Sequence, residues 1–306
     1  MFRVSLKASG QLAPRRLVAC FALLAAVTVA RAGDIPGIGQ SIEFVQKLQT
    51  PSGGFLSMPS TVSLKTAPTL RATSTAGRAL HYLGGKLPNA EAAKKYIAGC
   101  YDAASGGFAD TPGGKAEMST TAIGIMAVRD LGMPIEPYAD GAVKFLTDHA
   151  KSFEDIRIAA AAFEGIKRPA PKRDAWLAEI KKLRNADGTF GAGAAQARET
   201  GSAAVILLRL GDPLEQRDNV LKALRAGQRP NGGFGKGATE TDADLETAYR
   251  VMRCFMMLKE KPARVEALRT YLAKCRNDDG GYGAAPGEPS SVNGAYYATI
   301  IRKWLD

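Results

Sequence analysis

A short glycine–aromatic motif that recurs along the chain constrains the fold more than any other feature. Its fullest form is QRPNGGFG at residues 228–235. The motif ends on an aromatic residue at five places, which are Phe55, Phe108, Phe190, Phe234 and Tyr282. Successive aromatics are 53, 82, 44 and 48 residues apart, and the step of 82 contains a degenerate unit near residues 151–165 that has lost its glycines. Six units of this length predict a repeat protein.

Each unit has the pattern of two helices. The first helix carries apolar residues at helical spacing with Lys and Arg between them, which is typical of a helix with one wet face. We predict these first helices at residues 41–48, 90–100, 138–149, 174–183, 215–226 and 264–275. We expect the glycine pair to end each of them, because glycine accepts the left-handed conformation of a helix C-terminus.

The second helix of each unit follows a Ser- or Thr-containing start and is nearly continuous in apolar residues, as in 203–208. A helix that is apolar on every side is buried on every side. The second helices are therefore predicted to form an inner layer and the first helices an outer layer. The fold class is all-α, an α/α toroid in which six helical hairpins close around a central cavity, with an open superhelix as the alternative.

The first 32 residues have the pattern of a secretory signal peptide. Arg15 and Arg16 precede an apolar run, 17–29, and Ala30-Arg31-Ala32 provides a small-x-small cleavage site. We expect residues 1–32 to be removed and residues 33–306 to form a single domain. This predicts an exported protein, periplasmic or extracellular, that meets the membrane only in transit.

Charge and cysteine content exclude some classes of partner and fold. The net charge of +11 falls to +6 for residues 33–306, because the leader contains five basic residues and no acidic ones. The remaining charge is spread along the chain without a basic block interleaved with aromatics, so we expect no nucleic acid partner. Cys100, Cys254 and Cys275 are an odd number in that region and do not predict a disulfide framework.

The motif followed by a Thr/Ser-Ala helix resembles the prenyltransferase/squalene-oxidase repeat of protein prenyltransferase β subunits and terpenoid cyclases. The resemblance covers essentially all of residues 33–306. The stretch Asp244-Leu245-Glu246-Thr247-Ala248-Tyr249 looks most like the geranylgeranyl transferase type-2 β subunit. The resemblance implies an α/α toroid around an apolar central cavity. It also leaves open a partner protein equivalent to the α subunit of those transferases.

The residues that the family uses for zinc-dependent prenyl transfer are replaced in this chain. Glu246, Ala248 and Asn293 stand where the family has the Asp, Cys and His that hold zinc. We therefore expect no metal and no other cofactor, because a zinc thiolate site needs soft and nitrogen ligands. At the diphosphate positions, Thr200, Glu240 and Ala243 replace the family's His, Arg and Lys, and only Tyr249 is kept. With a shift of one or two residues in this comparison, Lys236 or Arg250 contributes there instead.

The cyclase branch of the family protonates its substrate with an Asp-x-Asp-Asp motif, of which Asp242 and Asp244 supply two of the three acids. The alternative for these two residues is a polar loop and a helix N-cap. Acidic and phenolic groups at one end of an apolar cavity are suited to acid chemistry on an alkene. The catalytic candidates are Glu246, Asp244, Asp242 and Tyr249. The ligand-binding candidates are Tyr249, Arg250, Asn293, Tyr296, Lys236 and Thr200.

Three functions are compatible with these residues. The first is an exported toroid whose apolar cavity holds an isoprenoid, a lipid or a peptide segment, without conventional zinc-dependent prenyl transfer. The alternative is a prenyltransferase-like or cyclase-like enzyme that acts on an isoprenoid with an acidic site whose residues differ from the family's pattern. A polysaccharide hydrolase or lyase is least favoured, because the chain has only Trp176 and Trp304 as candidate sugar platforms and Trp176 falls on an outer helix.

Overall fold

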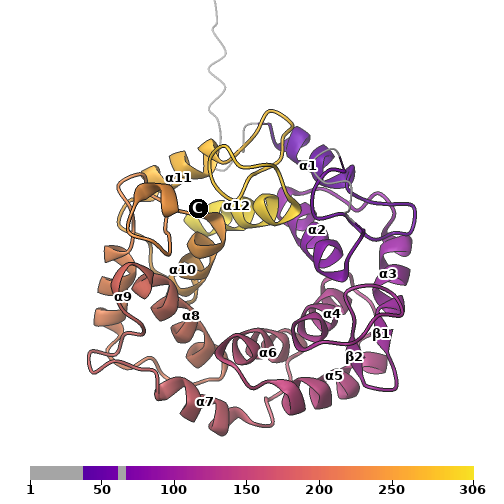
Figure 1. Cartoon of the computed structure of the whole chain (residues 1–306), viewed down its shortest axis with the longest axis horizontal. Coiled ribbons are helices and arrows are strands. Elements are labelled where there is room, and N and C mark those ends of the chain that lie inside the picture. Colours follow the sequence, from indigo (N-terminus) through magenta and orange to yellow (C-terminus); the bar gives the residue numbers. More distant parts are fainter. Residues whose placement is uncertain (1–36, 61–66) are drawn as a thin grey trace, which may run out of the picture. The chain divides into compact units, whose positions relative to one another are not determined.

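Twelve α-helices form a closed ring in the part of the chain that the computed structural model describes, residues 37–60 and 67–306 (Figure 1). The predicted signal peptide lies outside the described residues. The outer helices are α1 (Ile38–Gln46), α3 (Ala90–Gly99), α5 (Glu136–His149), α7 (Arg173–Lys181), α9 (Arg217–Ala226) and α11 (Val265–Lys274). The inner helices are α2 (Leu70–Leu83), α4 (Met118–Asp130), α6 (Phe153–Ile166), α8 (Gln196–Arg209), α10 (Leu245–Leu258) and α12 (Val292–Leu305). Both predicted layers are confirmed.

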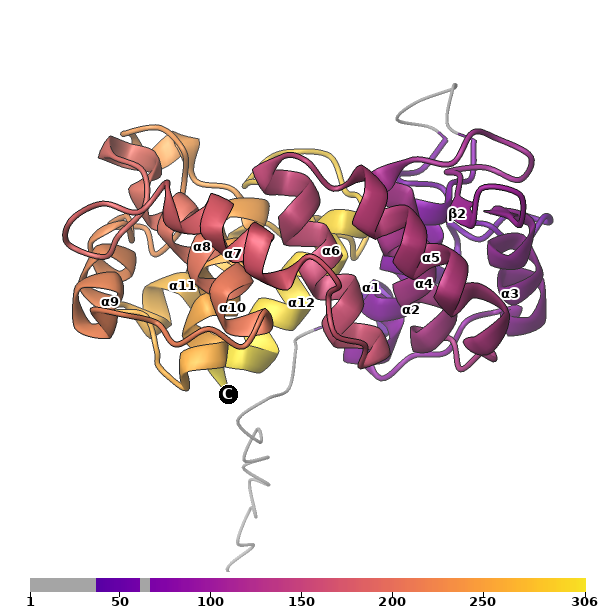
Figure 2. The ribbon, with the colours of Figure 1, turned by 90° about the horizontal axis from the view of Figure 1, so that it is seen from below.

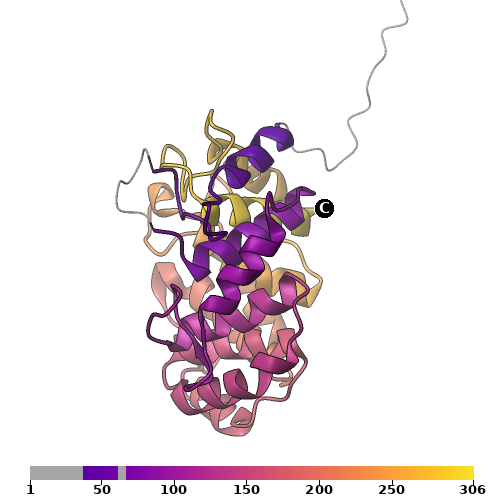
Figure 3. The same ribbon diagram turned by 90° about the vertical axis from the view of Figure 1, so that its right-hand side faces the viewer.

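The ring closes where the last repeat meets the first. Inner helix α12 packs against α2, and α1 also contacts α12. Arg276 strengthens this closure by donating from Nη2 to the carbonyl of Gly37 at 3.2 Å and to Oε1 of Gln40 at 2.7 Å. Edge-on views show the helix pairs standing side by side around the ring (Figures 2 and 3). The closed toroid is therefore confirmed over the open superhelix.

The glycine pairs do not end the first helices, so that expectation was wrong. Helix α9 ends at Ala226, and the pair Gly232-Gly233 lies in a separate turn beyond it. Gly232 has φ +91°, and a Cβ there would collide with the backbone of Ala267 in the next outer helix, α11. The first glycine of each pair thus lets a turn of one repeat lie directly on the outer helix of the next. The glycines are contacts between repeats rather than helix caps.

Each motif aromatic is buried between its two helices, and hydrogen bonds join its backbone to the inner helix. The N–H of Phe55 donates to Thr73 Oγ1 at 3.0 Å, and Phe190 N–H donates to Thr200 Oγ1 at the same distance. Thr200 is fully buried, and its hydroxyl donates back to the carbonyl of Phe190 at 2.9 Å. Thr200, predicted to bind ligand, is instead a structural residue whose hydrogen bonds are used inside its own repeat.

A few further elements complete the described residues. The turn of the second repeat forms a two-residue hairpin of β1 (Tyr101–Asp102) and β2 (Gly107–Phe108), and two 3₁₀ turns, η1 (Gly193–Ala195) and η2 (Glu240–Asp242), precede α8 and α10. Cys100, Cys254 and Cys275, the three cysteines of the described residues, are buried and unbridged. No helix in residues 37–60 and 67–306 is long and apolar enough to cross a membrane.

Candidate functional site

The inner helices enclose a central cavity in two connected halves. One half, about 390 Å³, lies among the first turns of α2, α4, α6 and α12, and we call it the N-terminal chamber because the inner helices begin there. The C-terminal chamber, about 340 Å³, lies among the later turns of α2, α4, α6 and α8 and the middle of α10. Residues common to the walls of both chambers are Arg78, Met126, Arg157, Ile158, Tyr249 and Tyr296. These six side chains form the waist between the two halves.

The cavity is charged, so the expectation of an apolar cavity was wrong. Five arginines and two carboxylates line the C-terminal chamber, which leaves it with a net charge of +3. They are Arg78, Arg129, Arg157, Arg209 and Arg253, with Asp130 and Glu164. The apolar run 203–208 packs against neighbouring helices, whereas Arg209, which follows it, reaches the cavity. The inner helices are thus apolar on the sides that meet protein and polar on the side that meets the cavity.

Local pairing accounts for much of this charge. Asp130 accepts from Arg78 Nε at 2.7 Å and is also bonded by Arg129. Arg209 Nε donates to Glu164 at 2.9 Å. Arg129 and Arg209 occupy the last turns of α4 and α8, where a cation offsets the partial negative charge of the helix end. These residues have a structural role whether or not a ligand binds.

Arg253 is different, because within the described residues it is the one arginine of the cavity wall that has no carboxylate partner. Its Nη2 donates to the Tyr249 hydroxyl at 3.0 Å, and its guanidinium carbon lies 4.6 Å from the centre of the Trp304 ring. Its Nε is buried without a hydrogen bond. It lies in the interior of α10 rather than in the last turn, so the helix dipole does not explain it. Arg253 therefore carries a positive charge in the cavity wall that no carboxylate of the described residues offsets.

The hydroxyls of Tyr249 and Tyr296 face each other at the waist, 3.4 Å apart. Burial opposes ionisation of Tyr249, but the positive charge of Arg253, a hydrogen bond from Tyr296 and the charge of Arg209 outweigh it and lower the pKa of Tyr249 to about 7. Burial and the neighbouring Tyr249 raise the pKa of Tyr296 well above its ordinary value. Tyr249 is thus the phenol of the pair that ionises first.

This asymmetry predicts a tyrosine that ionises near neutral pH. A titration of near-ultraviolet tyrosinate absorbance should show one phenol ionising at about pH 7 in the wild type, and this step should vanish in Tyr249→Phe. Tyr282→Phe is the control, because the pKa of buried Tyr282 is raised and that phenol contributes nothing near neutrality. If every phenol of the wild type titrates near the ordinary value of ~10 or above, Arg253 and Arg209 do not polarise Tyr249 as described.

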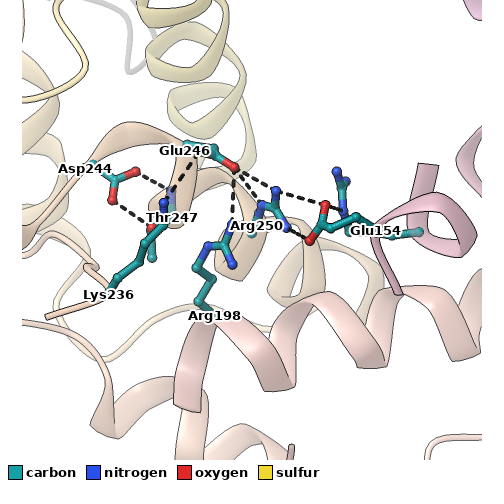
Figure 4. Close-up of polar contacts among 8 residues, drawn as sticks. Glu154, Arg198, Lys236, Asp244, Glu246, Thr247 and Arg250 are labelled. Carbon is teal, nitrogen blue, oxygen red and sulfur yellow. Dashed lines mark hydrogen bonds and ion pairs between the residues drawn. The ribbon is translucent and has the colours of Figure 1, made fainter. Parts of the chain in front are cut away.

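Two of the predicted catalytic acids have local structural roles. Asp244 is the N-cap of α10 and accepts hydrogen bonds from the backbone N–H and hydroxyl of Thr247 at 2.7 and 2.8 Å (Figure 4). Asp242 accepts from the backbone N–H of Thr239 at 2.9 Å and from its hydroxyl at 2.6 Å, and these bonds lower its pKa. Neither carboxylate lines the chambers. The alternative of a loop acid and a helix cap therefore describes their geometry.

Glu246 belongs to an ion-pair network that ties three inner helices together (Figure 4). It accepts from Arg250 Nη2 at 2.7 Å and from Arg198 Nη2 at 3.4 Å, and Lys236 lies 4.0 Å away at the exposed edge. Arg250 also donates to Glu154 at the start of α6, at 2.7 Å. Burial opposes ionisation of Glu246, but the charge of Arg250 and the other cations prevail, and its pKa is lowered. Glu246 is thus a carboxylate at neutral pH rather than a proton donor.

The structure therefore divides the predicted residues into two groups. Tyr249, Tyr296 and Asn293 line the central cavity, and Arg250 borders a small hollow beside it. Asp242, Asp244, Glu246, Lys236 and Thr200 lie outside the chambers in caps, ion pairs or the core. Sequence reasoning missed the cavity arginines; their signal is a basic residue inside an otherwise apolar inner helix. Within the described residues, no three His, Cys, Asp or Glu side chains come together as metal ligands.

A closed ring of six helical hairpins around a central cavity is the architecture of the α/α toroids. The profile of the prenyltransferase alpha-alpha toroid domain matches residues 7–93, 76–157 and 138–302, and the chain belongs to that family. Drimenyl diphosphate synthase from Streptomyces showdoensis is 30% identical over 175 residues, which are 53% of this chain but only 32% of the synthase.

Solved structures share the fold. The type II terpene cyclase MstE from Scytonema superposes with a TM-score of 0.60 at 11% identity, over 88% of this chain and 96% of the cyclase. A protein from Actinoplanes gives a TM-score of 0.58 at 12% identity, over 88% of this chain and 98% of that protein. At these identities the structural likeness concerns the fold alone.

Proposed function

We propose that this toroid binds an anionic amphiphile of the isoprenoid diphosphate class in its central cavity. The observation that carries the proposal is Arg253, a cavity arginine without a carboxylate partner in a chamber of net charge +3. A diphosphate needs several cations to offset its charge, and the planar fork of arginine matches phosphate oxygens in pairs. The anionic group would lie beside Arg253, and the apolar part would contact Met126, Ile158 and Tyr82 in the same chamber.

Two further points support this class of ligand. Both chambers fall in the size range of small-molecule pockets, roughly 300–1,000 Å³. The name of the relative that matches in sequence, drimenyl diphosphate synthase, points to isoprenoid diphosphate chemistry. The particular resemblance of residues 244–249 to the geranylgeranyl transferase type-2 β subunit stays a prediction from the sequence.

Binding is favoured over acid catalysis because the carboxylates near the cavity are already paired. Glu154 contacts Arg157 and Arg250, and although burial opposes its ionisation these arginines lower its pKa to about 2. Glu246 is likewise held as a carboxylate by Arg250. A cyclase that protonates an alkene requires a neutral acid aimed into the cavity. The second candidate is a cyclase or transferase activity that uses residues different from the family's catalytic set. Tyr249 at the waist is the residue that favours it.

Export is part of this proposal. It is supported by the basic and apolar pattern of residues 1–32 and by the cleavage site before Gly33. The N-terminal residue of the protein recovered outside the cytoplasm of its own cells tests it, with Gly33 as the expected result.

Calorimetric titration tests the ligand class directly. We expect inorganic pyrophosphate to bind in a salt-sensitive manner, farnesyl diphosphate to bind more tightly, and farnesol to bind at least ~10-fold more weakly than its diphosphate. The salt dependence reports the electrostatic contribution of the arginines. Equal affinities for farnesol and its diphosphate, or the absence of any pyrophosphate binding, would contradict the proposal.

A further inference from the structure

Three of the six seams between neighbouring repeats are closed by a recurring backbone hydrogen bond. At three seams the first N–H of an inner helix donates to a carbonyl in the loop of the following repeat, two residues after the motif aromatic. The three bonds are Leu70 N to Asp110 O at 2.7 Å, Leu245 N to Ala284 O at 2.8 Å, and Val292 N to Ser57 O at 2.9 Å. The three donor residues are almost completely buried. A stretch of extended chain therefore covers the start of the inner helix at each of these seams.

The seam between the third and fourth repeats is one of the three seams that lack this bond within the described residues, and it is the one at which a pocket opens. The equivalent donor is Phe153, the first residue of α6, and the equivalent acceptor is Ala192, two residues after Phe190. In the described part of the chain no hydrogen bond joins them, and Phe153 is only half-buried. A pocket of about 410 Å³ opens at this place, between the starts of α6 and α8. Here the chain turns into η1 after Gly191 instead of crossing to α6.

The pocket combines apolar walls with polar groups that have no partner. Phe153, Phe190 and Leu183 form the apolar part, and Leu183 is 54% exposed. The hydroxyl of Ser202, a residue only 3% exposed, has no hydrogen bond, and neither has Nε of Arg198. Glu199 at the exposed edge makes no ion pair or hydrogen bond within the described residues. The Phe153 N–H and the Glu199 carboxylate are therefore the polar groups of this pocket that an occupant can pair.

We propose that this seam binds an extended peptide segment of a partner protein. The segment supplies a backbone carbonyl to Phe153 N–H, as the chain's own loops do at the three closed seams. An apolar side chain of the segment lies between Phe153, Leu183 and Phe190. A neighbouring Lys or Arg of the segment pairs with Glu199.

A peptide fits this seam better than an aliphatic chain. A lipid tail would fill the space beside Leu183 but would leave the Phe153 N–H and the Glu199 carboxylate unpaired. An extended peptide presents backbone groups and side chains alternately, and so it meets both kinds of wall. The ion pairs of Glu246 and Arg250 with Arg198 and Glu154 lie between this pocket and the central cavity, so the seam and the anion site are separate.

The test begins with random octapeptides displayed on phage and selected on the immobilised full-length protein. We expect enrichment of sequences in which an aromatic or large aliphatic residue adjoins Lys or Arg. A synthetic peptide of the selected sequence should bind wild type in fluorescence anisotropy and lose about tenfold or more in affinity with Leu183→Lys. Ile38→Lys is the matched control, since Ile38 is the other exposed large apolar residue of the described chain, at 38%. Saturating pyrophosphate should not compete.

A second measurement reports the hydrogen bond itself. Bound peptide should slow the amide hydrogen exchange of Phe153 by about tenfold or more, while the already bonded Leu245 amide is unchanged. Glu199→Ala should bind the peptide more weakly and lose the preference for an adjoining basic residue, which covers the case in which Leu183→Lys does not fold. Failure to enrich any such peptide, equal binding by Leu183→Lys of unchanged melting temperature, or an unchanged Phe153 amide overturns the proposal. Occupation by a second copy of this chain, seen as a Leu183-dependent dimer, overturns it as well.

Discussion

Arg253→Met is expected to weaken the binding of inorganic pyrophosphate by about 10- to 100-fold. The substitution keeps the bulk of the side chain and removes a charge and at least one unpaired buried donor, Nε. Hydrogen bonds to charged groups contribute about 1.5–3 kcal/mol, and each 1.4 kcal/mol corresponds to a tenfold change in affinity. The measurement is calorimetric titration of both proteins below about pH 7, where Tyr249 is mostly protonated and adds no negative charge to the chamber.

The matched control is Arg225→Met on outer helix α9. Arg225 is paired with Glu260 at 2.8 Å on the outer surface, 40% exposed, so the total charge falls equally while the cavity is untouched. We expect Arg225→Met to bind pyrophosphate like the wild type, apart from a small long-range effect that salt removes. Unchanged affinity in Arg253→Met, with an unchanged melting temperature, would exclude Arg253 from the anion site.

The binding of anions should also respond to Tyr249. As pH rises through about 7, the phenol of Tyr249 becomes an anion and reduces the positive charge of the chamber. The pH dependence of pyrophosphate affinity therefore reports Tyr249, whereas Arg253→Met measured below about pH 7 reports Arg253. The contact of Arg253 with Tyr249 explains why a positively charged chamber and a lowered phenol pKa occur in one place. Arg253 adds positive charge to the chamber, and the same charge is the chief cause that lowers the pKa of Tyr249.

The fold could be predicted from the sequence because its determinants are local and repeated. A turn that requires glycine, a buried aromatic and an apolar helix recur in each unit, and the outer helix predicted at 264–275 is observed at Val265–Lys274. The role of the glycines could not be read in the same way. Their requirement comes from Ala267 and its counterparts in the next repeat, which are distant in sequence and meet the turn only when the ring is assembled.

The site was predicted only in part, for a related reason. Tyr249 and Tyr296 were identified, but the arginines that define the cavity lie one or two to a helix, and periodicity does not reveal which side of a buried helix faces the cavity. Tyr249 and Arg253 are four residues apart and so share one side of α10, which is a readable signal for the pair. For Asp244 the alternative predicted from the sequence, a helix N-cap, is the observed geometry, because an acid just before a helix is most simply its cap.

The contact between repeats predicts that Gly232→Ala will be far more destabilising than Gly287→Ala. Both glycines have a left-handed backbone, with φ of +91° and +84°. A Cβ at Gly287 meets nothing within 4 Å, whereas a Cβ at Gly232 runs into the backbone of Ala267 and Leu268 in α11. Gly287→Ala should therefore cost only the conformational penalty, about 1–2 kcal/mol. Gly232→Ala adds an overpacking penalty of about 1–3 kcal/mol, which a helix backbone relieves less readily than a side chain.

The measurement is the free energy of unfolding in urea for the wild type and the two variants. A total loss of about 2–5 kcal/mol in Gly232→Ala would be a large fraction of the ~5–15 kcal/mol that stabilises a typical domain. Because both positions have a similar positive φ, the difference in unfolding free energy between the variants measures the contact of the turn with the outer helix of the next repeat. Equal losses would mean that the turn can move away from α11 at little cost, and that the glycine pair is kept for its own conformation rather than for ring assembly. A larger loss in Gly232→Ala would locate much of the stability of the toroid in the contacts between repeats, because the corresponding Gly53 and Gly280 meet Ala92 and Gln40 of the next outer helix in the same way.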